Sequence, residues 1–333
     1  MKQVLVIICC VIFASFATKP WQHNTLKPEP KWGFYAHEKI NYFAVFLLPP
    51  GLLKLYKTNI TYIKEHATDP DKRRYAIPNE APRHYIDLDK YGKYPFDTLP
   101  RNWQDAVNSF TEDTLQSHGI VPWWVQTMQA RLTTAFKNKD LRSVLRLSAE
   151  LGHYIGDMHV PLHTSSNHNG QKTNQNGIHG FWESRIPELL AEKDWDFVWE
   201  KADYIKDISG FTWAKVLESA NAADSVLNFE QILNKQEKPD SKYAYENRNG
   251  KTLRQYSTSY TKKYNNMLKG MVERRFKQSV YAVASYWYTA WVNAGQPDVS
   301  QFVNTPISDA ERKEMEALNA TWNAGKAKGR ICD

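Results

Sequence analysis

The sequence contains little cysteine, and this limits how the folded chain can be stabilised. Three cysteines occur among 333 residues, and two of them, Cys9 and Cys10, lie in the apolar N-terminal stretch. Loss of that stretch would leave only Cys332, so no intramolecular disulfide could form. A disulfide-stapled scaffold is therefore excluded. The hydrophobic core or bound metal has to hold the mature chain together.

The apolar run at the N-terminus is too short to be read as a membrane span. Lys2 provides a positive start, the residues from Val4 to Phe16 are apolar, and Ser15-Phe-Ala17 has the small-x-small pattern of a cleavage site. We therefore expect a signal peptide at residues 1–17 and an exported protein, either periplasmic or secreted. A lipid-anchored form is the weaker alternative, because Ile8 before Cys9 fits a lipoprotein signal poorly.

The chain also lacks the alternating pattern of paired strands, repeated strand–helix units and internal repeats. We therefore predict an all-α protein with a single multi-helix domain at residues 32–333. Residues 18–31 contain three prolines and no periodicity, which indicates a flexible lead-in or a removable prosegment. The formal net charge is +7, but the residues from Trp32 onward carry 39 basic and 35 acidic side chains, a net charge of +4. This mild excess suits a phosphate-bearing substrate but is equally ordinary for a solvated surface.

Helical periodicity predicts a series of helices along the chain. The segment 253–293 is expected to be one helix or two, with Gly270 as a possible break, whereas 69–95 and 236–251 are expected to be loops. The predicted helices are His37–Leu48, Gly51–His66, Trp103–Ser117, Trp123–Lys137, Leu141–Met158, His179–Leu190, Trp213–Leu227, Leu253–Asn293 and Ser308–Ala327.

Metal-type ligands are concentrated between residues 153 and 183. His153 and Asp157 are four residues apart, and so are His179 and Glu183, which places each pair on one helix face. His163 lies between the pairs, just after Pro161. Imidazole nitrogen and carboxylate oxygen are donors that zinc accepts. Their density favours a site with more than one metal ion, and hence hydrolysis.

A simpler interpretation has to be weighed for each pair. A lone His-x-x-x-Asp on a helix is usually a surface ion pair or a satisfied core contact. Two pairs and a third histidine within 31 residues make that interpretation much weaker. We expect His159 to lie beside the ligands rather than among them, and His168 to be exposed.

Further motifs extend this cluster into a family pattern. Together they resemble the trinuclear-zinc phosphodiesterases, a superfamily that contains bacterial zinc-dependent phospholipases C and the S1/P1 nucleases. The resemblance runs from residue 32 to residue 183, about half of the chain. The residues that carry it are Trp32-Gly-Phe-Tyr-Ala-His37, Asp69 with the basic run after it, His84-Tyr-Ile-Asp87, the segment from His153 to His163, and His179 with Glu183.

The resemblance implies three zinc ions. The first would be held by Asp69, His84, His153 and Asp157, and the second by His163, His179 and Glu183. The third would be held by His37, by Asp157 as a bridge, and by the α-amino and backbone groups of Trp32.

Trp32 departs from the family pattern in its position. In the family this tryptophan is the first residue of the mature enzyme, whereas cleavage after Ala17 leaves 14 residues before it. Either a second cleavage after Lys31 exposes its amine, or the third zinc site is altered.

The mechanism implied is metal-assisted attack on a phosphodiester. Asp69 is the residue expected to orient or deprotonate the attacking water as well as to bind metal. Arg73, in the basic run after it, is expected to offset charge on the phosphoryl group. A solvated basic loop is the competing interpretation for that run.

The sequence indicates the type of reaction more clearly than the identity of the substrate. Tyr85 and Phe34 are expected to border it, by stacking on a base or by lining a choline-sized pocket, with core packing as the alternative. By a small margin we favour phospholipase C-type activity, and the alternative is an S1/P1-type nuclease acting on single-stranded DNA or RNA. A non-catalytic, metal-stabilised binding protein is the third hypothesis. We expect a monomer with no protein partner, which contacts a phospholipid or nucleic-acid substrate and, transiently, a membrane surface.

Overall fold

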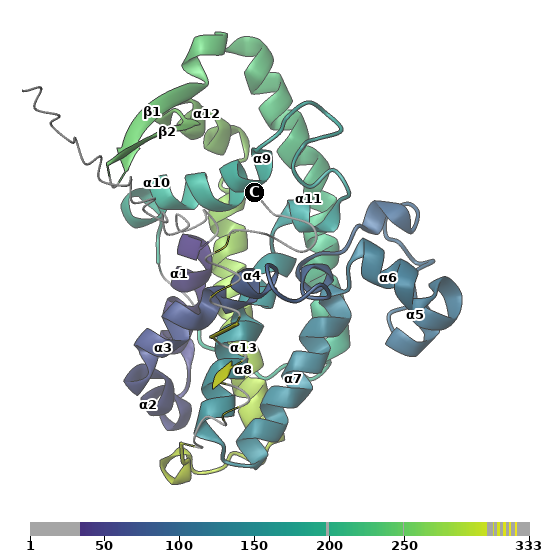
Figure 1. The fold of residues 1–333 in the computed structure, drawn as a ribbon, viewed down its shortest axis with the longest axis vertical. Coiled ribbons are helices and arrows are strands. Elements are labelled where there is room, and N and C mark those ends of the chain that lie inside the picture. The colour runs from purple at the N-terminus through teal and green to yellow at the C-terminus, as the bar shows by residue number, and fades with distance from the viewer. Residues whose placement is uncertain are drawn as a thin grey trace, which may run out of the picture.

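Helices dominate the computed structural model (Figure 1), which describes residues 34–197, 200–248 and 250–304 and seven positions between 309 and 324 (309, 312, 313, 316, 317, 320 and 324). The expected signal peptide, the lead-in and most of the predicted helix Ser308–Ala327 lie outside these residues. The helices are α1 (Phe34–Ala44), α2 (Pro50–Thr58), α3 (Ile60–Glu65), α4 (Asp69–Arg73), α5 (Trp103–Phe110), α6 (Glu112–His118), α7 (Val121–Lys137), α8 (Leu141–Met158), α9 (Ile178–Gly180), α10 (Ile186–Asp194), α11 (Ile208–Gln236), α12 (Thr258–Met267) and α13 (Met271–Asn293).

Short 3₁₀-helical segments link several of these helices. One further segment, η6, is a π-helical turn that joins α9 to α10 without a break. The turns are η1 (Val45–Leu47), η2 (His66–Thr68), η3 (Ala81–His84), η4 (Leu88–Lys90), η5 (Pro161–Thr164), η6 (Phe181–Arg185), η7 (Pro239–Ser241) and η8 (Val299–Gln301).

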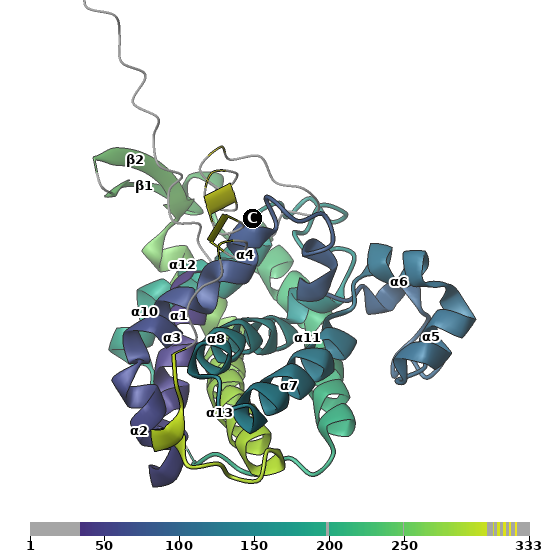
Figure 2. The same cartoon turned by 60° about the horizontal axis from the view of Figure 1, so that its bottom comes forward.

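The predicted helix Leu141–Met158 is confirmed with the same bounds as α8. Its start is defined by Asp140, whose side chain accepts a hydrogen bond from the Ser143 N–H at 3.2 Å, as an N-cap does. In Figure 2, α8 lies in the middle of the bundle, with α3, α7, α11 and α13 around it. This position explains why residues on every side of α8 are buried.

Other predicted boundaries differ from the structure. The predicted helix 51–66 is divided into α2 and α3 at Asn59, and the predicted loop 69–95 contains α4 and two tight turns. Gly270 does separate two helices, α12 and α13. Propensity marks helical segments better than it marks their ends, because packing decides where a marginal turn continues.

In the described part of the chain, the all-α prediction is confirmed apart from one hairpin within the predicted loop 236–251 and just beyond it. Strands β1 (Tyr243–Arg248) and β2 (Lys251–Tyr256) pair in antiparallel register, with Arg248 opposite Lys251. The sequence between them is Asn-Gly, the combination that two-residue hairpin loops favour. That dipeptide was the available signal for the hairpin. The pattern around it is too polar to read as a strand from periodicity alone.

Two hydrophobic clusters form the interior. The larger contains the apolar face of α8 and residues of α1, α7 and α13. The smaller contains Phe181 and Trp182 of η6 together with apolar residues of α11 and α12. The two halves of the expected ligand set are therefore carried by elements that pack in different clusters. His153 and Asp157 lie on α8, in the larger cluster, and His179 and Glu183 lie on α9 and η6, in the smaller one.

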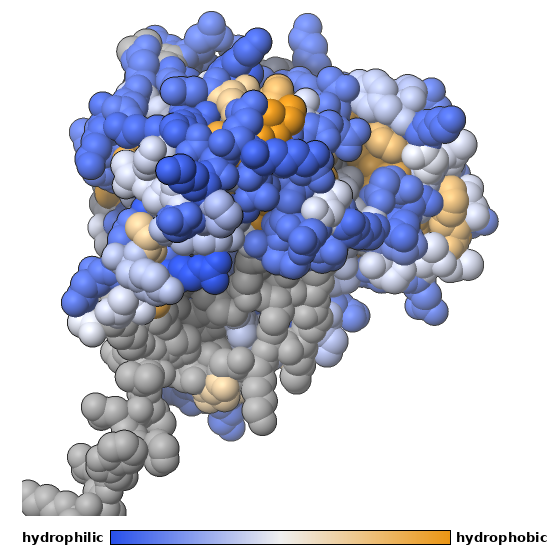
Figure 3. All heavy atoms as spheres, turned by 90° about the horizontal axis from the view of Figure 1, so that it is seen from above, coloured by the Kyte–Doolittle hydropathy of each residue, from blue (hydrophilic) through white to orange (hydrophobic). Residues whose placement is uncertain are grey.

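The surface seen from above is largely hydrophilic, and its apolar residues form small separate patches (Figure 3). Within the described ranges, no helix combines the length and the apolar character needed to cross a bilayer.

The contact between α1 and α8 depends on Gly152, which leads to a stability prediction. A Cβ at residue 152 would lie 1.9 Å from the Asn41 side-chain oxygen. Asn41 cannot move away freely, because its amide donates to the carbonyls of Ile63 at 3.2 Å and Ala149 at 3.0 Å. We expect Gly152→Ala to lower the free energy of unfolding by about 1–3 kcal/mol through overpacking, measured by denaturant titration.

Gly51→Ala is the matched control for that change. It is also a helical glycine, but its nearest neighbour would be a Trp291 ring carbon at 3.4 Å. Alanine favours the helix, so stability should be unchanged or slightly higher. Equal losses in the two variants would contradict the role given to the Gly152–Asn41 contact.

Candidate metal centre

His153 and Asp157 form the base of the candidate site. Both project from α8 one helical turn apart, and their side chains are 0% and 2% exposed. The His153 Nε2 lies 3.3 Å from the Asp157 Oδ2. The spacing of four residues therefore brings the two groups together as the sequence predicts.

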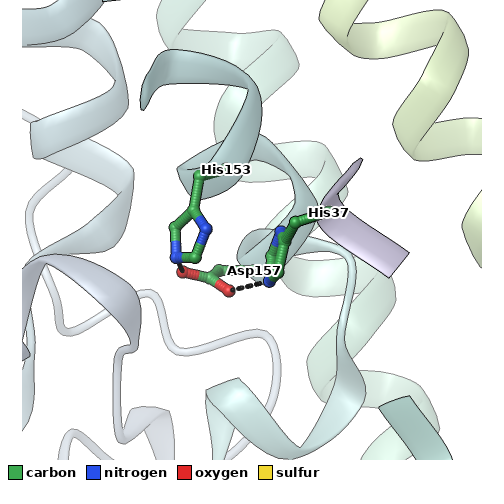
Figure 4. Close-up of side chains that lie close together, drawn as sticks. All are labelled: His37, His153 and Asp157. Carbon is green, nitrogen blue, oxygen red and sulfur yellow. Dashed lines mark ion pairs between the residues drawn. The ribbon is translucent and has the colours of Figure 1, made fainter. Parts of the chain in front are cut away.

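His37 joins them from α1. Its ring stacks on the His153 ring with centroids 3.9 Å apart, and its Nε2 lies 3.4 Å from the Asp157 Oδ1 (Figure 4). A Cβ at Gly156 would come within 2.9 Å of the His37 Nδ1. The absence of a side chain at residue 156 is thus what lets His37 reach the carboxylate.

A second group surrounds His84, at the end of η3. Its Nδ1 lies 3.1 Å from the His153 Nε2 and 3.0 Å from the Asp157 Oδ2. Asp71, on α4, completes this group: its Oδ1 lies 3.7 Å from the His153 Nε2 and 3.8 Å from the His84 Nδ1. Four side chains from three separate elements thus meet in one place.

The third group is built by η5, α9 and η6. The Nε2 atoms of His163 and His179 are 3.0 Å apart, and the Glu183 Oε2 lies 2.7 Å from His179 and 3.5 Å from His163. Glu183 sits on the π-helical turn, a feature often found at functional sites. The structure therefore gathers these three residues as the sequence predicts.

Asp157 connects the groups. Besides His37, His84 and His153, its Oδ1 lies 3.9 Å from the His163 Nε2. His37 makes a further link, since its Nε2 is 3.2 Å from the Glu183 Oε1. The three groups thus form one continuous cluster rather than separate sites.

The carboxylates of this cluster are held in the charged form. Burial would raise the pKa of Asp157, but His153 and His163 hold it well below its usual range. Burial acts in the same direction on Glu183, but the neighbouring imidazoles of His163, His179 and His37 lower its pKa well below its usual range. At Asp71 the effect of burial is outweighed by His153, Arg74 and His84, and the pKa is again lowered.

The arrangement of lone pairs tests whether a cation fits. The His153 Nδ1 lies 2.8 Å from the Ala67 carbonyl oxygen, which can only accept, so this nitrogen carries the proton. Its Nε2 therefore offers a lone pair to a space already lined by the Asp157 and Asp71 oxygens and by the His84 Nδ1. Acceptors that face one another this closely are unfavourable unless a positive charge lies between them.

His163 shows the same arrangement. Its Nδ1 bonds the His84 carbonyl, so its Nε2 lone pair points toward His179 and Glu183. Backbone carbonyls that orient the far nitrogen of a histidine are typical of metal ligands. The residues present fit zinc: Asp71, His84 and His153 in one group, His163, His179 and Glu183 in another, and His37, His153 and Asp157 in a third.

Asp69 is not where the sequence prediction put it. Its carboxylate pairs with His66 at 2.5 Å and with Lys72 at 2.7 Å, and it belongs to none of the three groups among the described residues. Asp71 takes its expected place. The physical reason is the helix: α4 is a single turn, and residues two apart on a helix project in different directions.

Arg73 is likewise displaced from its expected position. It lies in a buried polar network, 2.8 Å from Glu150 and 3.4 Å from Glu80, and it also donates to the Tyr154 hydroxyl. Arg74 is the arginine beside the centre, with its Nη1 3.3 Å from the Asp71 Oδ1. Arg74 rather than Arg73 therefore lies beside the group that contains Asp71.

Glu80 is a residue that the sequence analysis missed. Its side chain is completely buried, accepts hydrogen bonds from Arg83 and the Tyr154 hydroxyl, and lies 3.7 Å from the His84 Nε2. Burial would raise the pKa of Glu80, but His84 and Arg73 hold it below its usual range. The signal was present in the sequence, because Glu80 and His84 have the same four-residue spacing as the other acid–histidine pairs.

The remaining predicted site residues are placed as follows. Tyr85 is 5% exposed and packs against Gly119, with its hydroxyl directed to the Ser117 carbonyl, so core packing accounts for most of its surface. Phe34 is half-buried at the start of α1. Trp32 lies outside the described residues. His159, expected beside the ligands, is buried and bonds the Ile155 carbonyl.

Comparison with known proteins supplies one match. The model of the S1/P1 nuclease family matches residues 32–289, a range that includes all three groups. A search of curated proteins found no match.

The positions of Asp69 and Asp71 yield a test with a built-in control. Asp71→Asn removes a charged oxygen from the His84 group, so we expect zinc affinity to fall by at least about tenfold. Asp69→Asn makes the same chemical change two residues away and should leave zinc affinity unchanged. Zinc bound after equilibrium dialysis against a competing chelator measures both. Greater zinc loss from the Asp69 variant would show that the assignment to Asp71 is wrong.

Proposed function

Because the chain belongs to the S1/P1 nuclease family, we propose that it is a zinc-dependent phosphodiesterase that cleaves single-stranded nucleic acid. The observation that carries the proposal is the meeting of three buried His/Asp/Glu groups at Asp157, inside the region that the family model matches. The family match favours the nuclease, which the sequence analysis ranked second, over the phospholipase C that it ranked first.

Bound zinc would supply Lewis acidity and a water of lowered pKa at the centre. The chain's own contribution is to hold charged carboxylates and oriented imidazoles in a buried setting. Asp157 is 2% exposed at its side chain and Glu183 is 10% exposed, so both serve as enclosed ligands.

Asp71 differs from these two in its access to solvent. Its side chain is 21% exposed, which makes it the carboxylate of the cluster that a water or a substrate can reach. A carboxyl group with a lowered pKa is a weak base, so Asp71 is suited to accept a hydrogen bond and orient a water rather than to remove its proton unaided.

Arg74 stands beside Asp71 and can offset negative charge on a phosphoryl group. Arg73 supports it indirectly, since its bonds to Glu80 and Glu150 hold α4 against α8. Burial would lower the pKa of Arg73, but Glu150 raises it well above its usual value, so its charge is permanent.

The non-catalytic hypothesis fits the geometry less well. Structural zinc sites are closed sets of four ligands. Here one carboxylate contacts members of all three groups, and another is open to solvent. Such a centre has room for a reacting group.

Substrate choice separates the two enzymatic hypotheses. We expect the purified protein to hydrolyse single-stranded DNA or RNA and to leave phosphatidylcholine intact in a parallel assay. A chelator should abolish the activity, and added zinc should restore it. Turnover of phosphatidylcholine alone would reverse the assignment, and no chelator-sensitive turnover of either substrate would favour a binding protein.

His153→Ala should abolish hydrolysis and also lower the melting temperature, because His153 belongs to two of the three groups. His118→Ala, on the last turn of α6 and outside all three groups, is the control and should keep both properties. Thermal unfolding and zinc content are measured alongside activity. An active His153 variant of unchanged stability would contradict the zinc assignment.

We further propose that the protein is exported and that a second cleavage, after Lys31, makes Trp32 the mature N-terminus. The support is the leader-like composition of residues 1–17, the proline-rich segment after it, and a family match that begins at residue 32. N-terminal sequencing of the exported protein should read Trp-Gly-Phe. A mature start at Thr18 would mean that no free amine is available at Trp32.

A further inference from the structure

Glu80 is a buried carboxylate outside the three metal-binding groups. Its side chain is completely buried, and among the described residues it belongs to none of those groups. It directly precedes η3, the turn that ends at His84. Burying a carboxylate is costly unless the groups around it need its charge, so each of its neighbours has to be considered.

One side of Glu80 is held by arginines and a phenol. The Arg83 Nη1 lies 2.6 Å from the Glu80 Oε2, and the Arg73 Nε lies 3.4 Å from the same oxygen. The Tyr154 hydroxyl donates to Oε1. These contacts keep the carboxyl group charged and fix its orientation. Arg73 does not depend on Glu80 alone, because its Nη1 lies only 2.8 Å from Glu150.

The other side of Glu80 faces His84. The Glu80 Oε1 lies 3.7 Å from the His84 Nε2, and among the described residues it is the nearest carboxylate oxygen to that nitrogen. The nitrogen is buried and has no hydrogen-bond partner in the described part of the chain. A negative charge at this distance still acts on it through a weakly polarisable interior. A hydrogen bond of about 2.9 Å would need a movement of less than about 1 Å.

The backbone on both sides of His84 is fixed by neighbouring elements. The Val121 N–H donates to the Tyr85 carbonyl at 3.2 Å, and the His163 ring bonds the His84 carbonyl. The Tyr154 ring packs edge-on against the His84 imidazole, with centroids 5.3 Å apart. What remains to be decided is which of the two ring nitrogens carries the proton.

The two positions of that proton have opposite consequences for a cation. A proton on Nδ1 would be accepted by the Asp157 Oδ2 at 3.0 Å or by the His153 Nε2 at 3.1 Å, and it would fill the space that the ligand lone pairs share. The Nε2 lone pair would then face the charged Glu80, which is unfavourable. A proton on Nε2 faces Glu80 instead and leaves the Nδ1 lone pair free. Glu80 therefore competes with Asp157 for the imidazole proton.

The other two histidines with an oriented ring follow the same rule with a weaker acceptor. His153 turns its Nδ1 to the Ala67 carbonyl, and His163 turns its Nδ1 to the His84 carbonyl. At His84 the corresponding acceptor is a carboxylate. A charged acceptor fixes the tautomer more firmly and makes the far nitrogen a stronger metal ligand.

We propose that Glu80 is a positioning residue of the metal centre: its buried charge keeps the His84 proton on Nε2 and so leaves the Nδ1 lone pair free for zinc. Glu80 acts through His84 and is not itself a ligand. The inference rests on the zinc binding of the proposed function and not on the identity of the substrate.

Glu80→Gln removes the charge with almost no change in size. We expect zinc affinity to fall by at least about tenfold, because nothing then opposes a proton on the His84 Nδ1. Glu150→Gln is the matched control. Glu150 is also buried and pairs with Arg73, but in the described part of the chain it pairs with no histidine of the three groups, so zinc affinity should not change. Equilibrium dialysis against a competing chelator measures both variants.

Tyr154→Phe separates the positioning role from the integrity of the polar network. It removes a hydrogen bond from Glu80 but leaves the charge beside His84. We expect the melting temperature to fall and zinc affinity to stay as in the wild type. This variant decides the question even if Glu80→Gln does not fold. A loss of zinc affinity in Tyr154→Phe or in Glu150→Gln as large as that expected for Glu80→Gln would mean that Glu80 only supports the network.

Nitrogen-15 NMR of the zinc-loaded protein with labelled histidine gives the position of the proton directly. The His84 Nε2–H resonance should lie downfield in the wild type, because its acceptor is charged. It should move upfield in Glu80→Gln and stay in place in Glu150→Gln. An unchanged resonance in Glu80→Gln would overturn the proposal.

These measurements need no substrate, so their outcome is independent of the nuclease assignment. If oligonucleotides are cleaved but Glu80→Gln binds zinc as tightly as the wild type, the positioning role is wrong and the nuclease stands. If no phosphodiester is cleaved, the nuclease is wrong, and the zinc titration still decides the role of Glu80. A wild-type protein that binds no zinc would overturn both.

Discussion

The buried carboxylate of Asp157 is the constraint around which this protein is organised. A charge at 2% exposure is strongly unfavourable unless positive charge surrounds it. Around it the chain places imidazole nitrogens that could hold a cation beside the carboxylate, from four elements: His37 from α1, His84 from η3, His153 from α8 and His163 from η5. Each of these elements must therefore pack correctly for the centre to form. Because the buried charge needs these partners, the packing of the helices and the metal-binding chemistry depend on each other.

The packing around α8 shows how the backbone meets this requirement. Gly152 and Gly156 let α1 approach closely enough for Asn41 to bond α8 and for His37 to reach Asp157. η6 is held in place by the smaller hydrophobic cluster, and its Glu183 contacts His37. The hairpin is tied to the same turn, because the buried Arg185 pairs with Glu246 and bonds the Tyr256 carbonyl. The elements that carry the polar centre are thus held by two apolar clusters.

Much of the centre was predictable because helical spacing is local. The pairs His153/Asp157 and His179/Glu183 follow from a four-residue interval, and the limits of α8 follow from its apolar face and its cap. Asp69 and Asp71 could not be separated in this way. Both are carboxylates on one short helix, and its rotation about its own axis decides which of them faces His84. The choice between Arg73 and Arg74 has the same origin.

The sequence by itself determined the helical class, the ligand types and the family, since these depend on periodicity and on residue chemistry at fixed intervals. Only the tertiary structure decided that Asp157 joins three groups and that Asp71 rather than Asp69 belongs to the His84 group. The reason is physical. Intervals along a helix are set by its geometry, whereas distances between helices are set by the packing of side chains far apart in the chain.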